Sequence, residues 1–475
     1  MEIQVEKKAE SAEAREHDLL PRRLGLLSAI AVLVGSTIGT GIFRSPAGIA
    51  TKVPSEGLYL LLWVLGGFFS LCGALALAEL AGALPRTGGI FVYLREGWGR
   101  LPAFLFGWGE LIIIRASALG AISTVFAEYF LRLLGKEDPQ TVHYVAAGAI
   151  LSVAIFNIVG VKLGALVQNL TTGAKYGALV VLVLAAFLFG AKNPSPVSVE
   201  QSVSSNAPSF MMFGLAFISL LWVYDGWADV TFVGGEVKRP ERFLPITLIA
   251  GTLAVIGIYL LANLAYLHLL SIDEIANSKL VAADMAYRII GDGGVRFVSI
   301  AVMISAFGTL NGSMMTGPRI FFAMADDGLF FKKIASVHPR FKTPYVAISL
   351  AAGLAILFVM VRSFEQLADT FVLGIWPFYA LGVAAVYALR RKRPDMPRPY
   401  KTLGYPVTPA LFILAVAILL GNALLGDIRY YSAKLAGEPN PTEWSGALMV
   451  FAIILAGIPA YYIWKATRSK RNDER

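Results

Sequence analysis

The chain has 475 residues, of which 56% are hydrophobic and only 15% are charged. Soluble proteins carry about a quarter of their residues as charged groups, so this composition excludes a soluble enzyme, a nucleic-acid-binding module and a disordered chain. Apolar runs of about 18 residues or more instead predict an all-α polytopic membrane protein. The alternating strands of about ten residues that build a membrane β-barrel do not occur.

Residues 1–23 are polar and of mixed charge, and they lack the apolar core of a signal peptide. We therefore expect a cytoplasmic tail. The single cysteine, Cys72, excludes an intramolecular disulfide and a cysteine-based metal site. Because it lies in an apolar stretch, we expect it to pack as a small hydrophobic residue.

Hydropathy divides the rest of the chain into twelve segments, each long enough to cross the apolar core of a bilayer. The expected spans are 25–50, 57–84, 101–131, 142–160, 164–190, 208–235, 243–270, 295–324, 344–362, 366–389, 405–426 and 445–465.

The chain has a net charge of +9, and its Lys and Arg residues are distributed unevenly among the loops. If the N-terminus is cytoplasmic, most of the 41 Lys and Arg residues fall in the two tails and in the loops after even-numbered spans. Cytoplasmic loops carry such an excess. The run Arg390-Arg391-Lys392-Arg393 then marks the cytoplasmic end of span 10, and both termini are expected to be cytoplasmic.

Spans 1 and 6 each contain residues that weaken a helix at mid-membrane. Span 1 carries three glycines between Gly35 and Gly41, and span 6 carries an acid and a glycine between Trp222 and Trp227. Glycine costs about 1 kcal/mol relative to alanine in a helix. Close packing through Gly35 and Gly39 is an alternative for span 1 alone. Two such breaks five spans apart predict a transporter built of two inverted five-helix repeats.

Broken helices define the chemistry of a ligand. The free N–H groups of the half-helix that begins near Gly41 suit a carboxylate, and open carbonyls near Thr37 and Trp222 suit an ammonium group. A ligand with both groups on one carbon is an α-amino acid.

Several motifs together resemble the amino acid–polyamine–organocation (APC) superfamily, in particular the bacterial branch of its L-type amino-acid transporter (LAT) family. They are GSTIGTGIFRSP in span 1, WGELIIIRAS in span 3, VYDGWADVTFVGGEVKRPERFLP in span 6 and its loop, IYLLANLAYLHLL in span 7, and FGTLNGSMMTGPRIFFAMADDG in span 8. The resemblance covers roughly residues 24–400.

The resemblance implies a LeuT-like fold with 12 transmembrane helices in a 5+5 inverted repeat. The first repeat would be 24–190, the second 208–391, followed by two further helices in 392–466 and a tail, 467–475. Substrate would bind at the breaks of helices 1 and 6 and move by alternating access.

The resemblance also assigns roles to individual residues. Backbone around Thr40 and Gly41 would hold the substrate carboxylate, and the carbonyls of Thr37, Trp222 and Asp225 would hold its amine. Trp222 stands at the position of an aromatic outer gate. The complete expected substrate-binding set is Ser36, Thr37, Gly39, Thr40, Gly41, Trp222, Tyr224, Asp225, Gly226 and Tyr259.

Two of these residues keep alternative interpretations. Asp225 could pair with the substrate ammonium, carry protons or cap the broken helix. Tyr259 matches a family tyrosine near the substrate carboxylate, and an ordinary aromatic residue of the helix interface is nearly as good an explanation.

Lys175 lies in the middle of span 5. A charged lysine at the bilayer centre costs roughly 2.5–3.5 kcal/mol on insertion scales, so it is usually functional. In sodium-independent relatives, a lysine here stands where related transporters bind sodium. We expect its ammonium to bridge unwound span 1 and span 8, where Ser305 and Thr309 lie one turn apart. It would act as a static tether or as a proton carrier.

Other charged residues are expected to be structural. Glu110 and Arg115 are five positions apart, which does not align them on one α-helical face, so we expect each to have a separate partner. Five charged residues after span 6 are expected to form an inner gate or a positioning network: Glu236, Lys238, Arg239, Glu241 and Arg242.

The leading hypothesis is a sodium-independent carrier of neutral L-amino acids that works by exchange or proton symport. Alternatives are a carrier of polyamines or cationic amino acids, or an amino-acid sensor with little flux; no catalytic constellation supports an enzyme. No P-loop and no paired histidines occur, so neither ATP nor a metal nor another cofactor is expected. The loop 132–141 lacks a cysteine for a covalently linked single-pass subunit, which favours a free-standing protein of a bacterial plasma (inner) membrane.

Overall fold

The computed structural model describes residues 22, 24–136, 138–159, 161–190, 210–341, 343–437 and 444–473. Regular structure in these ranges is helical, apart from one isolated bridge between Leu24 and Val237. Ten helical segments are long and apolar enough to cross a membrane, and Phe210–Tyr224 and Tyr345–Val359 are shorter apolar helices. The prediction of an all-α membrane protein is therefore confirmed. Most of the expected tail and all of 191–209 lie outside the described residues.

The first five predicted spans form a bundle with one short helical connection. The helices are α2 (Leu26–Thr37), α3 (Gly41–Lys52), α4 (Glu56–Ala83), α5 (Ile90–Trp98), α6 (Arg100–Gly109), π-helix η1 (Glu110–Ile114), α7 (Arg115–Leu133), α8 (Pro139–Val159) and α9 (Val161–Phe189).

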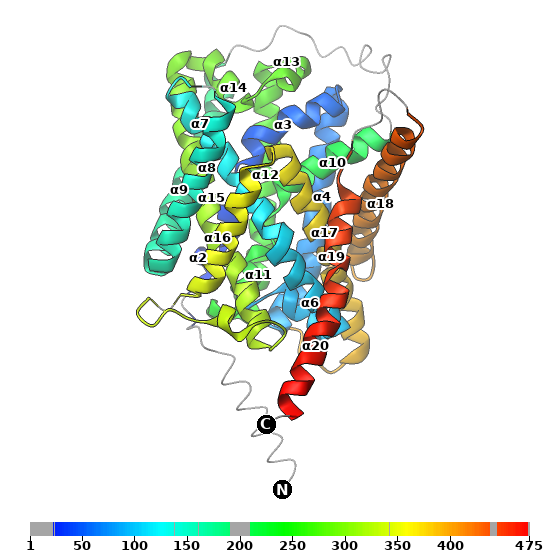
Figure 1. Cartoon of the computed structure of the whole chain (residues 1–475). Helices are drawn as coiled ribbons and strands as arrows, with labels where there is room; N and C mark the ends of the chain where they lie inside the picture. Colours follow the sequence, from blue (N-terminus) through cyan, green and yellow to red (C-terminus); the bar gives the residue numbers. More distant parts are fainter. Residues whose placement is uncertain are drawn as a thin grey trace.

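The remaining spans add seven crossings, with two short α-helices between them in the described part of the chain. These helices are α10 (Phe210–Tyr224), α11 (Asp229–Phe232), α12 (Pro240–Leu269), α13 (Ile272–Asn277), α14 (Val281–Ile290), α15 (Asp292–Asp326), α16 (Tyr345–Val359), α17 (Phe364–Lys392), α18 (Val407–Leu435), α19 (Ala447–Leu455) and α20 (Gly457–Asp473). We call the end of the bundle at which α20 finishes the α20 end, and the opposite end, which carries α13 and α14, the α13 end (Figure 1).

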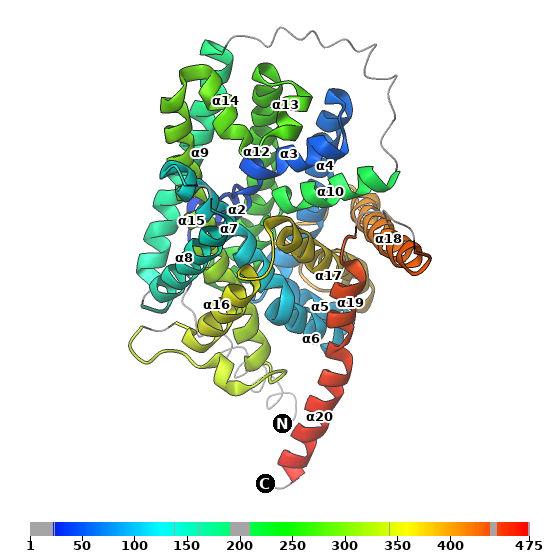
Figure 2. The same cartoon turned by 45° about the horizontal axis from the view of Figure 1, so that its top comes forward.

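Two spans are interrupted, and they are the two that the glycine pattern predicts. Span 1 is helical as α2 and α3 with residues 38–40 between them, and span 6 is helical as α10 and α11 with residues 225–228 between them. The halves pack crosswise, because α3 lies against α10 (Figure 2) and α11 lies against α2. Each interruption is thus enclosed by the other span, as irregular backbone at membrane depth requires.

Two glycines allow the breaks to approach one another. Gly226 has φ +106°, and a Cβ added there would lie 2.7 Å from the backbone of both Ser36 and Thr37. A Cβ on Gly41 would lie 2.9 Å from Cα of Val223. A side chain at either position would therefore push the two broken spans apart.

We predict that Gly226→Ala lowers the melting temperature of the purified protein, because it adds both backbone strain, of order 1–3 kcal/mol, and a clash with α2. Gly48→Ala in α3 is the matched control, since a Cβ there meets nothing within 4 Å. It should leave the melting temperature unchanged or raise it. Equal melting temperatures for the two variants would contradict this explanation of the break.

Candidate functional site

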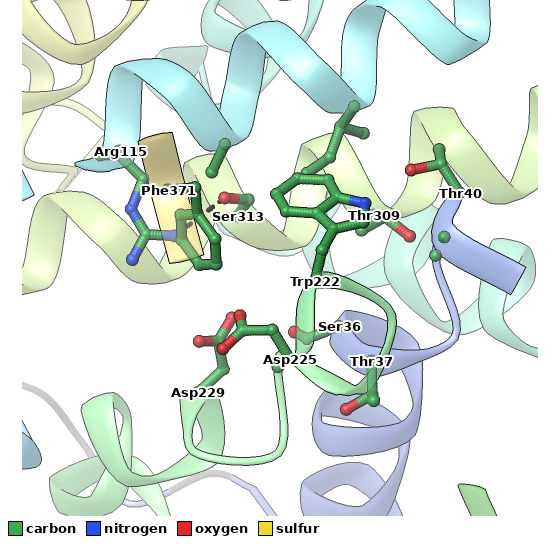
Figure 3. Close-up of a pocket in the computed structure, with 15 residues that line it drawn as sticks. Ser36, Thr37, Thr40, Arg115, Trp222, Asp225, Asp229, Thr309, Ser313 and Phe371 are labelled. Carbon is green, nitrogen blue, oxygen red and sulfur yellow. Dashed lines mark hydrogen bonds between the residues drawn. The ribbon is translucent and has the colours of Figure 1, made fainter. Parts of the chain in front are cut away.

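A small polar pocket lies where the two breaks meet (Figure 3). Its volume of about 40 Å³ has room for only a few water molecules, so an organic ligand requires the surrounding helices to move. The lining residues come from both breaks and from α2, α3, α7, α10, α11, α15 and α17: Ser36, Thr37, Gly39, Thr40, Gly41, Arg115, Ala118, Ile122, Trp222, Asp225, Gly226, Asp229, Thr309, Ser313 and Phe371.

Eight of the ten expected substrate-binding residues line this pocket, and two tyrosines lie behind it. The Tyr224 hydroxyl donates a 3.0 Å hydrogen bond to the carbonyl of Trp63. The Tyr259 hydroxyl contacts the carbonyls of Thr37 at 2.7 Å and Val223 at 3.1 Å. Tyr259 therefore ties the end of α2 to the end of α10, and its contact with a substrate stays a prediction.

Lys175 on α9 occupies the place between span 1 and span 8 that the sequence predicts for it. Its buried ammonium donates to the carbonyl of Gly35 and, at 3.1 Å, to Oγ1 of Thr309. Ser305, one turn away from Thr309, has its hydroxyl 3.5 Å from the carbonyl of Gly39. Span 8 and Lys175 together contact two carbonyls at the interrupted end of α2.

The separate pairing expected for Glu110 and Arg115 is wrong. Arg115 Nε lies 3.1 Å from Glu110 Oε2, and both side chains are buried. The pair forms because residues 110–114 adopt the π-helix η1, whose hydrogen bonds join residues five positions apart and so place i and i+5 on one face. Arg115 Nη1 also donates to Ser313 Oγ at 2.9 Å.

The pocket has more carboxylates than the sequence interpretation assigned to it. Asp229 lies four residues after Asp225, across the break of span 6, and Figure 3 shows both carboxyl groups facing the same part of the pocket. Thr316 Oγ1 lies 3.4 Å from Asp229 Oδ2, whereas Oδ1 of Asp225 is shielded from solvent without a hydrogen bond within the described part of the chain. Arg115, which is paired with Glu110, lines the same pocket as Asp225 and Asp229, so this region holds more carboxylates than positive groups and can accept another positive group.

The sequence interpretation left out six pocket residues. Arg115 and Asp229 could have been found, because charged residues inside spans are usually functional. Ala118 and Ile122 follow Arg115 at helical spacing, and Ser313 and Phe371 reach the pocket only through packing of α15 and α17.

Aromatic rings and ion pairs close the pocket toward the α13 end. Trp222 makes edge contacts with Phe371 at 5.3 Å and Phe364 at 6.1 Å between ring centroids. Above them, Arg44 of α3 lies 3.3 Å from Glu128 and 2.8 Å from Glu365. This arrangement supports Trp222 as a lid, with the ion pairs of Arg44 as a second layer.

The opposite side is also closed. Arg95 of α5 pairs with Asp327 at the end of α15, and Arg319 lies 3.8 Å from Glu236. Of the five charged residues expected to form a network after span 6, Glu236 has this ionic contact, and the backbones of Glu236 and Lys238 pair with Leu24. Within the described residues, no group of three His, Cys, Asp or Glu side chains is arranged to hold a metal ion.

We predict that Arg44→Gln opens the α13 end several-fold more often, because partly exposed ion pairs contribute up to about 1 kcal/mol each. Cys72 is buried and can be replaced by alanine, after which Thr40→Cys provides one reporter in the pocket. A membrane-impermeant maleimide should label that cysteine faster in the Arg44→Gln protein.

The matched control is Arg288→Gln, which removes a more exposed ion pair with Glu274 at the same end of the bundle. Labelling should stay at the parental rate. Equal labelling of the Arg44 and Arg288 variants would show that Arg44 does not hold the pocket closed.

Comparison with known proteins places the chain in a family. The profile described as "Amino acid permease" matches residues 24–461. The serine/threonine exchanger SteT of Bacillus subtilis is 32% identical over 460 residues, which cover 96% of this chain and 99% of that protein. The human b(0,+)-type amino acid transporter 1 is 30% identical over 87% of this chain and 85% of its own length. The human cystine/glutamate transporter is also 30% identical, over 94% of this chain and 85% of its own length. The resemblance to the APC superfamily and to LAT-type transporters is therefore confirmed, and the chain belongs to the amino acid permease family.

Proposed function

We propose that this protein is a secondary transporter that moves amino acids across the plasma (inner) membrane by alternating access, independently of sodium. The observation that carries the proposal is the pocket formed by the breaks of spans 1 and 6, which brings the first N–H groups of α3 and the carbonyl ends of α2 and α10 together. Both termini lie in the cytoplasm in this proposal, and 24–190 and 208–391 are the two repeats.

The backbone ends specify a zwitterion. The start of α3 at Gly41 presents N–H groups without intrahelical partners to a carboxylate. An ammonium group fits beside Asp225 and Asp229. The indole of Trp222 restricts the space above, and Thr40, Thr309 and Ser313 supply hydroxyl groups, so small neutral L-amino acids are the substrates we expect. The serine/threonine exchanger among the relatives supports this class.

The contacts of Lys175 support sodium independence. Its ammonium already bridges the carbonyl of Gly35 and the hydroxyl of Thr309, which are oxygen ligands of the kind a sodium ion would use. Exchange requires that the loaded carrier reorients more readily than the empty one. Proton symport instead requires that the empty carrier returns and that a group in the carrier binds and releases the proton. The name of SteT favours exchange.

Loop 132–141 lacks the cysteine that a covalently linked single-pass subunit would use. We propose that the carrier functions without such a subunit.

The test is uptake of labelled serine, threonine and alanine into liposomes that contain the purified protein. We expect uptake without sodium that internal unlabelled substrate stimulates; dependence on an inward proton gradient alone would indicate symport instead. Binding without flux would contradict transport and favour a sensor.

Lys175→Met should abolish uptake and lower the melting temperature, because the buried carbonyl of Gly35 loses a donor, at a cost of about 1–3 kcal/mol. The exposed Lys434→Met provides the control. Full transport by the Lys175 variant would remove this residue from the mechanism.

A carrier of cationic amino acids or polyamines is the second candidate, favoured by Oδ1 of Asp225, which has no hydrogen bond among the described residues, and by neighbouring Asp229. Arginine and putrescine should then compete with labelled substrate. Asp225→Asn should lower the affinity for these competitors roughly tenfold or more, because a charge-assisted contact contributes about 1.5–3 kcal/mol. Asp273→Asn, at the α13 end, is the control. If neither cation competes, the site is restricted to neutral substrates.

A further inference from the structure

A second, larger pocket lies at the α13 end of the bundle and shares no lining residue with the pocket at the breaks. Its volume is about 530 Å³, within the range of about 300–1,000 Å³ that is usual for ligand sites. It is formed by the end of α7, by α14 and by the start of α15. Figure 1 shows α14 at the α13 end of the bundle, above α7 and α15.

Both signs of charge line this pocket. Arg132 and Arg296 contribute guanidinium groups, and Asp284 and Asp292 contribute carboxylates. Ser299 adds a fully buried hydroxyl, whose oxygen has no hydrogen-bond partner within the described residues. Buried polar atoms are normally satisfied, so an orphaned hydroxyl in the wall of a charged pocket points to a ligand that supplies the missing partner.

A row of aromatic side chains, which we call the aromatic lane, continues from this pocket toward the membrane core and consists of Phe126, Phe130, Phe156 and Phe307. On α7, Phe126 and Phe130 share a face with Leu133, which lines the pocket. Their rings lie 6.0 Å apart, and Phe126 contacts Phe307 of α15 at 5.9 Å. Phe307 in turn contacts Phe156 of α8 at 6.3 Å.

The same lane follows α15. Ile300, Met303 and Phe307 lie on the face that carries Arg296, at helical spacing below it. Ile300 is 46% exposed and Phe156 is 37% exposed, so this surface faces the surroundings of the bundle. In a protein that spans a membrane, those surroundings at this depth are lipid acyl chains.

We propose that this pocket binds the headgroup of a phospholipid that carries a phosphate and a primary ammonium group, and that the acyl chains of the same lipid lie along the aromatic lane. The phosphate lies between the two guanidinium groups, which bind phosphate oxygens in a fork geometry. The ammonium lies beside Asp284 and Asp292. Ser299 donates its hydroxyl proton to a phosphate or ester oxygen.

Two features select this occupant. A purely anionic headgroup would leave two carboxylates facing it, whereas a zwitterionic headgroup complements both signs of charge. A soluble zwitterion would leave the lane uncovered, whereas a lipid fills both parts at once.

The experiment uses the full-length protein purified in detergent, with phosphatidylethanolamine as the probe. Native mass spectrometry and thermal unfolding should show that this lipid is retained and that it raises the melting temperature. The double variant Arg296→Gln/Asp292→Asn should weaken lipid binding roughly tenfold. Both side chains are exposed, so the protein should still fold. Arg429→Gln, exposed on distant α18, should bind lipid as the parent does.

Ser299→Ala separates lipid binding from folding. The lipid-free variant should be as stable as the parent or more stable, because it loses a buried hydroxyl without a partner, whereas its stabilisation by phosphatidylethanolamine should fall. Equal lipid retention by the double variant and the parent would overturn the proposal. So would equal or tighter binding of phosphatidylglycerol, or equal stabilisation by glycerophosphoethanolamine, which has the headgroup without acyl chains.

Discussion

The structure depends on how two broken helices satisfy their free carbonyl groups inside a membrane. Lipid hydrocarbon at that depth offers no hydrogen bonds, so each carbonyl at the end of α2 or α10 that faces away from the pocket needs a donor from the protein. Tyr259 supplies its hydroxyl to Thr37 and Val223, and Lys175 supplies its ammonium to Gly35. These two side chains hold the breaks in place from outside the pocket, and the N–H groups at the start of α3 remain directed toward it.

This division of roles explains the composition of the site. The carbonyl side of the breaks is already occupied, so a positive group on a substrate finds its counter-charge in Asp225 and Asp229 instead. The guanidinium of Arg115 keeps that acidic region from being wholly negative, and the π-turn that pairs it with Glu110 fixes its position. The pocket is closed at both ends, by Trp222 and Arg44 on one side and by the Arg95–Asp327 pair on the other. Alternating access requires such a closed state between the two open forms.

Much of this architecture could be predicted from the sequence, because the relevant signals are local. Spans are continuous apolar runs, and both breaks are marked by glycines that the backbone requires, as at Gly226. The contact of Lys175 with span 8 could be expected because a lone charge in a span needs partners. The Glu110–Arg115 pair could not, since it depends on a π-turn that no residue pattern marks. The closure by Arg44 joins residues 84 and 321 positions apart, and such contacts appear only when α3, α7 and α17 are placed together.

The central claim is that the site at the two breaks binds both charged ends of one amino acid, the carboxylate at the N–H groups that begin α3 and the ammonium group beside Asp225 and Asp229. Thermal shifts of the purified protein with serine, serine methyl ester and the deaminated analogue glycerate test it most directly. Serine should stabilise the protein, and each analogue should bind at least about tenfold more weakly, because each leaves one set of buried polar groups unpaired. Binding of either analogue as tight as that of serine would contradict the account.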